Sequence, residues 1–178
     1  MIPLKNIKIG LIGFGYWGKI ILRNLRELGY NDIVICETQE INWHDIGAKY
    51  EQVTDYRDLQ CDKVFVIVPV ESHYEVCNHF LERGVEVFCE KPLCLNREQC
   101  ENLYKTAEKN SCKIFVDWIF TFNPAVNKIK ELTSVLGKPK SIIANRLNYG
   151  PARHDVNARW DLASHDVSSV LYSRRDPY

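Results

Sequence analysis

The sequence predicts an α/β fold: a doubly wound parallel sheet, followed by the start of an incomplete α+β domain. Short apolar segments with strand character alternate with amphipathic helical segments up to about residue 120, and such alternation is typical of parallel sheets. A glycine-rich turn joins the first of these strands to the first helix. The alternation stops after residue 120, so we place one domain at residues 1–120 and the beginning of a second at residues 121–178.

The first domain divides into strands and helices by its apolar runs and by the residues that punctuate them. Its strands are short and almost wholly apolar, as expected where helices cover both faces of a parallel sheet. Asn96 is a favourable N-cap, and Gly29 and Gly84 each follow a helical segment and end it. We expect strands at residues 7–12, 33–36, 53–54, 63–68, 85–89 and 113–117, and helices at residues 19–28, 41–50, 72–83 and 96–110.

The second segment carries fewer regular elements. A helix is predicted at residues 124–136, where Gly137 ends it, and a second helix at residues 160–174. Residues 141–147 have the character of a strand, and residues 148–158 look irregular, with a turn at Gly150-Pro151. Two helices and one strand supply little apolar surface for a core of their own.

Charge and composition limit the classes of molecule that we expect this protein to bind. The formal net charge is zero, so nothing favours nucleic acid or an anionic membrane as a partner. The longest apolar run, residues 64–70, is too short to span a bilayer. Seven cysteines form no C-x-x-C pair, so we expect no metal site, buried free thiols and a reducing cytoplasm.

The glycine-rich turn, "KIGLIGFGYWGK" at residues 8–19, holds two overlapping phosphate-binding patterns. Read as a Walker A loop it needs Ser or Thr after Lys19 to ligate magnesium, but the next residue is Ile20. Read as G-x-G-x-x-G it needs a preceding strand, a following helix and an acidic residue about 20 positions later. Glu37 stands 19 positions after Gly18, at the end of the second strand, so the pattern favours a dinucleotide over a nucleoside triphosphate.

Each residue of this pattern has a physical task. Gly13 permits the tight turn, Gly15 lets the backbone approach a pyrophosphate, and Gly18 lets the helix pack against the strand. Backbone N–H groups at the start of the helix, at Phe14, Tyr16 and Trp17, point toward the phosphates. Glu37 accepts hydrogen bonds from the ribose hydroxyls and repels a 2′-phosphate, which favours NAD over NADP. The alternatives are a plain tight turn and a solvated acid, with Tyr16 and Trp17 as packing residues.

Three further segments resemble parts of a known family. Residues 64–92, "VFVIVPVESHYEVCNHFLERGVEVFCEKP", run from a strand through Pro69 and His73 to Glu90-Lys91-Pro92. Residues 159–168 read "RWDLASHDVS", and "FNPAV" at residues 122–126 stands where a second domain would begin. Together with the glycine-rich turn, these segments resemble the Gfo/Idh/MocA oxidoreductases, which include glucose–fructose oxidoreductase and inositol dehydrogenase.

The resemblance implies an NAD(P)-binding Rossmann domain and a second domain with a large open sheet. It implies oxidation or reduction of a secondary alcohol on a sugar, a nucleotide sugar or a cyclitol. In the family, the Glu-Lys-Pro lysine, here Lys91, lies at the nicotinamide and touches the reacting oxygen. Asp161 and His165 match the family's Asp-x-x-x-His pair. Pro69, His73 and Glu90 belong by the same resemblance to the cofactor site.

The chemistry of these residues agrees with those roles. Asp161 and His165 are four positions apart on a predicted helix and share a face. His165 can accept the proton of a hydroxyl, with Asp161 orienting it, and the Lys91 ammonium can stabilise an alkoxide. The alternatives are a surface Asp–His pair, a snorkelling lysine and a packing role for His73. The arginines at 146, 153 and 159 can meet a phosphate-bearing substrate, although we expect a solvated basic stretch.

The length of the chain departs from this family. Its members are usually much longer than 178 residues, so the resemblance implies that most of the second domain's sheet is missing. We therefore expect NAD binding with weak or absent turnover, and we keep a non-catalytic dinucleotide-binding module as the alternative. The apolar face of the helix at residues 160–174 would need a cover, which predicts a homo-oligomer.

Overall fold

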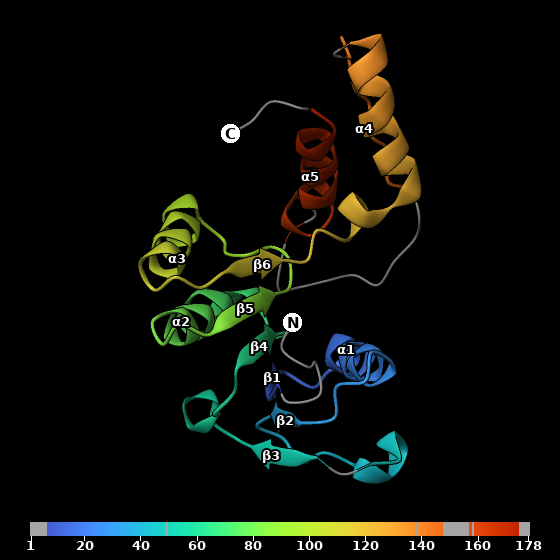
Figure 1. Cartoon of the computed structure of the whole chain (residues 1–178). Helices are drawn as coiled ribbons and strands as arrows, with labels where there is room; N and C mark the ends of the chain where they lie inside the picture. The colour runs from blue at the N-terminus through green and yellow to red at the C-terminus, as the bar shows by residue number, and fades with distance from the viewer. Residues whose placement is uncertain (1–6, 49, 138, 148–156, 158, 175–178) are drawn as a thin grey trace. The chain divides into compact units, whose positions relative to one another are not determined.

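The computed structural model describes residues 7–48, 50–137, 139–147, 157 and 159–174. They fall into two compact units, Met1–Val116 and Asp117–Tyr178 (Figure 1). The first unit is an α/β sheet structure and the second is helical in its described residues.

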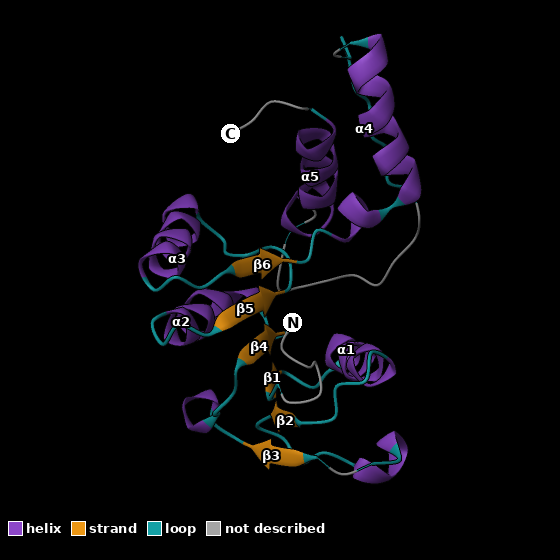
Figure 2. Ribbon diagram, in the orientation of Figure 1, coloured by secondary structure: helices purple, strands orange, loops and turns teal. Residues whose placement is uncertain are grey.

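The sheet of the first unit has six parallel strands in the order β3-β2-β1-β4-β5-β6. The chain moves outward from β1 to β3, returns to the other side of β1 for β4, and moves outward again to β6 (Figure 2). This confirms the predicted doubly wound sheet and places the reversal of strand order between β1 and β4. The strands are β1 Ile9–Ile12, β2 Ile33–Cys36, β3 Glu51–Val53, β4 Lys63–Val66, β5 Glu86–Cys89 and β6 Ile114–Val116.

Helices cover both faces of this sheet. Helix α1 (Tyr16–Glu27) lies on one face, and α2 (Val70–Leu81) and α3 (Arg97–Lys109) lie on the other (Figure 2). All four residues of β1 and all four of β2 are therefore buried, as their apolar sequences require. Asn96 caps α3 as predicted, since its side chain accepts a hydrogen bond from the Gln99 N–H at 2.9 Å.

The helix predicted at residues 41–50 is wrong in extent. Only a short 3₁₀ helix forms, at Trp43–Ile46, after which Gly47 takes a left-handed conformation with φ of 68°. A side chain at that φ is strained, so the glycine ends the helix where a longer one would have to continue. A second 3₁₀ helix, Tyr56–Asp58, follows β3.

The second unit contains a 3₁₀ turn at Ile119–Phe122 and helices α4 (Pro124–Leu136) and α5 (Ser164–Ser173). Helix α4 has the predicted bounds, and the Asn123 side chain accepts a hydrogen bond from the Ala125 N–H at 2.8 Å at its start. The helix predicted at residues 160–174 instead begins as a π-helical turn, Arg159–Ala163. The Tyr172 hydroxyl joins the two helices by donating to Asn127 Oδ1 at 2.8 Å.

The strand predicted at residues 141–147 is wrong. These residues have no regular secondary structure, and the described part of this unit offers no other strand with which they could pair. A strand is stable only when a neighbour satisfies its backbone groups, and an apolar pattern alone does not supply one. Most of the segment predicted to be irregular, with Gly150, Pro151 and Arg153, lies outside the described residues.

Five of the seven cysteines are buried, and all seven are free thiols. Desolvation raises the pKa of both Cys36 and Cys61 to about 11, so these two remain protonated at neutral pH. Among the helices of the described residues, none has the length and apolar character needed to cross a membrane.

Candidate cofactor site and active-site residues

The central strands of the sheet end level with one another. Ile12, the last residue of β1, pairs with Cys36 of β2 on one side and with Val66 of β4 on the other. Val66 pairs in turn with Cys89 of β5. Because neighbouring strands lie about 4.8 Å apart, the segments after β2, β1, β4 and β5 form one row along the carboxyl edge. Ligands of open parallel sheets bind at this edge, where the strand order reverses.

The three glycines after β1 differ in what a side chain would meet. At Gly13, where φ is +90°, an added Cβ would overlap the Ile67 carbonyl oxygen. At Gly18 it would overlap the Gly13 carbonyl oxygen, so helix and turn meet backbone to backbone. At Gly15 it would meet no atom within 4 Å. The packing of this unit therefore explains Gly13 and Gly18, while Gly15 leaves open space at the start of α1.

The Glu37 carboxylate is tied to the glycine-rich turn. Its Oε2 accepts a hydrogen bond from the Phe14 N–H at 2.8 Å, and its Oε1 accepts from Gln39 N–H and Thr38 Oγ1, each at 3.2 Å. Burial raises the pKa of Glu37, but these hydrogen bonds outweigh burial and lower it below the ordinary value. The carboxylate is therefore ionised at neutral pH, and with about four acceptor positions it keeps room for one more donor.

A cavity of about 610 Å³ opens over this edge. Residues 12–15 of the glycine-rich turn line it together with Glu37 and Pro69, as expected for a cofactor site. The other predicted cofactor residues do not line this cavity: Tyr16, Trp17, Gly18, His73, Glu90 and Lys91. The buried Phe14 side chain packs on Trp43 at 6.4 Å between ring centroids. The Phe14 N–H, expected to point toward the phosphates, donates to Glu37 Oε2 instead. Tyr16 and Trp17 are exposed, and their rings pack edge to face at 5.3 Å in the first turn of α1.

The cavity also has a polar wall that the sequence analysis missed. Arg57 contacts Asp55 Oδ2 at 3.2 Å and Glu75 Oε1 at 2.8 Å. The Tyr56 hydroxyl donates to the same Glu75 oxygen at 2.6 Å, and the Arg57 guanidinium lies 4.6 Å above the Tyr56 ring. The sequence carried one indication of this wall: Asp55, two positions after the end of β3, is of a residue type that often caps a helix. Nothing local in the sequence joins it to Glu75 on α2.

The Glu90-Lys91-Pro92 segment follows β5 directly. Lys91 is half-buried there, and its N–H donates to Glu90 Oε2 at 3.1 Å. His73, expected near the cofactor, is 1% exposed and does not line the cavity. Its Nδ1 lies 2.9 Å from the Pro92 carbonyl oxygen and its Nε2 lies 2.8 Å from that of Val68.

In the second unit, Asp161 lies in the π-helical turn and His165 in the first turn of α5, both half-buried. They are therefore not on one uninterrupted α-helix, as the sequence analysis assumed. Single π-helical turns within helices frequently occur at functional sites. The His165 ring packs edge to face on Phe120, with 4.9 Å between centroids.

Three residues around His165 were not expected. The Arg146 guanidinium donates hydrogen bonds to the Asp166 carboxylate, with Nη2 at 2.9 Å and Nε at 3.1 Å from Oδ1. The same guanidinium lies 4.9 Å from the centroid of the Phe120 ring. Only 24% of the Arg146 side chain is exposed, so the expectation of a solvated arginine is wrong at this position. Phe120 therefore contacts both the imidazole and the guanidinium. The arginine at 153 lies outside the described residues.

A family model described as "Oxidoreductase family, NAD-binding Rossmann fold" matches residues 7–118. The chain belongs to the Gfo/Idh/MocA oxidoreductase family. This confirms the resemblance to the family; the matched residues contain the glycine-rich turn and the Glu-Lys-Pro segment, whereas "RWDLASHDVS" lies beyond them. It also confirms NAD as the cofactor that the first unit binds, in place of a magnesium-bound triphosphate.

Relatives of this chain within and near the family act on cyclitols and nucleotide sugars. Inositol 2-dehydrogenase/D-chiro-inositol 3-dehydrogenase of Lactiplantibacillus plantarum is 30% identical over 96% of this chain and 53% of its own. UDP-N-acetylglucosamine 3-dehydrogenase of Acidithiobacillus ferrooxidans is 26% identical over 93% of this chain and 54% of its own. The WlbA dehydrogenase of Bordetella pertussis, solved with NADH and UDP-GlcNAcA, shares the fold with a TM-score of 0.64 at 18% identity, covering 76% of this chain and 42% of that one.

The chain spans about half the length of the curated relatives that it matches. Within that half, the residues of the first unit fit the family's cofactor. At Gly15, where an added Cβ would meet no atom within 4 Å, a pyrophosphate would lie against the N-terminus of α1, and the remaining acceptor position of Glu37 would suit a ribose hydroxyl. In the row along the carboxyl edge, Glu37 and Lys91 follow strands on opposite sides of the glycine-rich turn.

Proposed function

We propose that this protein is an NAD-dependent oxidoreductase that acts on a secondary alcohol of a sugar, a nucleotide sugar or a cyclitol. The observation that carries the proposal is the empty space at Gly15 beside a Glu37 carboxylate held by the backbone of the same turn. The fold does not need a glycine at position 15, whereas a bound pyrophosphate does. The activities of the curated relatives supply the class of substrate.

Glu37 sets the preference for NAD over NADP in this proposal. Its carboxylate is fixed by three hydrogen bonds and carries a full negative charge at neutral pH. A 2′-phosphate on the adenosine ribose would meet that charge at close range, whereas a 2′-hydroxyl can donate a hydrogen bond to it.

The catalytic roles follow from the chemistry of three residues. When bound, NAD accepts or gives a hydride at its nicotinamide ring. The Lys91 ammonium binds the reacting oxygen and stabilises the charge that develops there. His165 takes the hydroxyl proton on an imidazole nitrogen, and Asp161 orients the substrate or the imidazole. Pro69 lines the cavity, and Glu90 accepts the Lys91 N–H within the segment that carries Lys91.

Turnover tests this proposal. Nucleotide sugars and polyols are offered with NAD, and the absorbance of NADH is followed for the wild type, Lys91→Ala and His165→Ala. We expect slow NADH formation with at least one compound, since the chain spans about half the length of these relatives, and its loss in both variants. Arg97→Ala serves as the control, because Arg97 is exposed on α3 and pairs only with Glu101 one turn away. NADH formation that survives in both variants would refute the roles given to Lys91 and His165.

A dinucleotide-binding module without turnover is the second candidate. It is favoured by the apolar side chains that α4 and α5 leave exposed, among them Leu136 at 78% and Val167 at 56%. NAD binding with no turnover on any compound would support this candidate over the enzyme.

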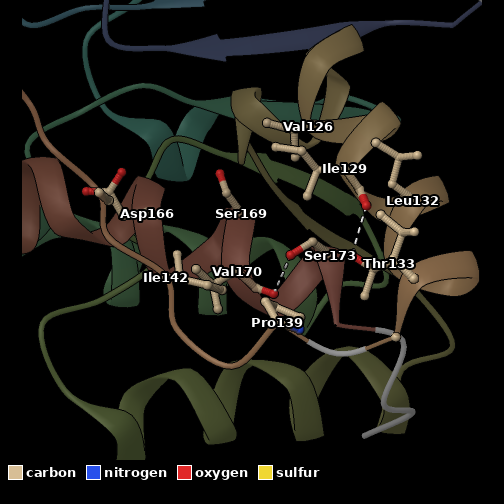
Figure 3. Close-up of a pocket in the computed structure, with 13 residues that line it drawn as sticks. Val126, Ile129, Leu132, Thr133, Pro139, Ile142, Asp166, Ser169, Val170 and Ser173 are labelled. Atoms are coloured by element: carbon tan, nitrogen blue, oxygen red, sulfur yellow. Dashed lines mark hydrogen bonds between the residues drawn. The ribbon is translucent and has the colours of Figure 1, made fainter.

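We also propose that the chain forms a homo-oligomer, with a second copy covering the apolar groove between α4 and α5. The groove encloses about 470 Å³. Val126, Ile129 and Leu132 of α4 face Val170 of α5 across it, and Pro139 and Ile142 close one side (Figure 3). Apolar surface of this kind is rarely left open on a stable monomer.

A further inference from the structure

His73 holds two backbone carbonyl groups at once. It lies on α2 and is fully buried, with Nδ1 2.9 Å from the Pro92 oxygen and Nε2 2.8 Å from the Val68 oxygen. Both distances are those of good N–H···O hydrogen bonds. A carbonyl oxygen can only accept, so each ring nitrogen must donate if both contacts are hydrogen bonds.

Both contacts tie the imidazole ring to backbone. A neutral imidazole carries one N–H, which can donate to one of the two carbonyl oxygens. A ring with an N–H on each nitrogen would donate to both, so in either state His73 can hold at least one of the two segments by a hydrogen bond.

The two carbonyl groups belong to the cofactor edge of the sheet. Val68 follows β4 and lines the cavity, while Pro92 closes the Glu90-Lys91-Pro92 segment after the neighbouring strand β5. The Glu90 N–H donates to the Val66 oxygen at 3.0 Å between the two chain segments. Beyond that bond, His73 joins the segment that carries Lys91 to the end of β4.

We propose that His73 is a positioning residue that fixes the Lys91 segment beside the end of β4 through its contacts to the Pro92 and Val68 carbonyl oxygens. The role rests on the proposed function, in which Lys91 serves the nicotinamide end of the cofactor. His73 itself touches neither cofactor nor substrate. It acts through the two backbone segments, which explains why a buried histidine stands between Pro69 and the Glu-Lys-Pro segment.

The contacts are tested without any ligand. The wild type is labelled with ¹⁵N-histidine, and the signals of His73 are assigned by their loss in His73→Gln; the chain has only five histidines. We expect a ring N–H of His73 to be held in a hydrogen bond and protected from exchange with solvent. A His73 ring N–H that exchanges as fast as that of the exposed His44 would overturn the inference.

The positioning role is tested with two ligands that differ only at the nicotinamide end. NADH and ADP-ribose are titrated into the wild type, His73→Gln, His73→Leu and the control His44→Gln, an exposed histidine away from the cavity. We expect His73→Leu to weaken NADH binding about tenfold and ADP-ribose binding less than twofold. His73→Gln keeps one donor and should fall between the wild type and His73→Leu for NADH.

The remaining outcomes distinguish a failure of the positioning role from a failure of the proposed function. Equal weakening of both ligands, or no weakening of either, would show that His73 only packs the core and would refute the positioning role. If the wild type bound neither ligand, the proposed function would fail, and the ¹⁵N spectrum would still show whether the His73 ring is held by the two segments. If His73→Leu did not fold, the ratio of NADH to ADP-ribose affinity in His73→Gln would decide the role.

Discussion

At the scale of single residues, Gly18 is required by the packing of the fold, whereas we assign Gly15 to cofactor binding. An added Cβ at Gly18 overlaps a backbone oxygen, but one at Gly15 meets nothing. We expect Gly18→Ala to lower the free energy of unfolding by about 2 kcal/mol and Gly15→Ala by less than about 1 kcal/mol. Urea unfolding measures both, and equal losses would contradict this assignment.

Glu37 is the second residue whose contribution can be measured. Its pKa is lowered in the folded state, so the ionised form stabilises the fold. This contribution is complete above the ordinary pKa of 4.5 and is lost as the pH falls through the lower, folded value. We expect Glu37→Gln to lower the free energy of unfolding by about 1 kcal/mol near pH 7 and by much less near pH 3. A difference that does not change with pH would contradict this origin.

At the scale of elements, the start of α5 depends on contacts from outside the helix. Arg146 binds Asp166 in a bidentate manner and covers one side of Phe120, whose ring also contacts His165. Arg146→Lys keeps the charge and loses the fork geometry. We expect it to shift the His165 ring signals and to lower turnover about tenfold, with NADH affinity unchanged.

Arg97→Lys is the matched control for that variant, because Arg97 pairs within its own helix and is 91% exposed. The same substitution there should change neither the His165 signals nor turnover. If Arg146→Lys behaved like this control, the cluster would have no part in positioning His165.

Local sequence patterns predict most of the secondary structure, but they do not predict contacts between residues that are far apart in the chain. Five of the six strands were predictable, because each is a short and largely apolar run. Strand β3, Glu51–Val53, begins with two polar residues and shares only Val53 with the strand predicted at residues 53–54. The strand predicted at residues 141–147 does not form, since pairing depends on a partner far away in the chain. His73 shows the same limit within the site: its type and position were noticed, but its partner Pro92 is 19 residues away. The Arg146–Asp166 pair spans 20 residues.

At the scale of the whole molecule, we expect the chain to form a homo-oligomer because the groove between α4 and α5 exposes apolar side chains. Ile129 is 54% exposed and Leu132 is 44% exposed at its wall. We expect the wild type to sediment as a dimer or larger species and Ile129→Glu to shift it toward the monomer. Lys105→Glu, on α3, is the control. A wild type that stays monomeric at high concentration would refute the homo-oligomer.

The central claim is that the carboxyl edge of the sheet binds NAD through the space at Gly15 and the charge of Glu37. Calorimetric titration of the wild type with NADH and then with NADPH tests it most directly. The account predicts saturable binding of NADH, at least tenfold weaker binding of NADPH, and loss of NADH binding in a folded Gly15→Ala variant. Folded wild type that releases no heat with NADH, or that binds NADPH equally well, would contradict it.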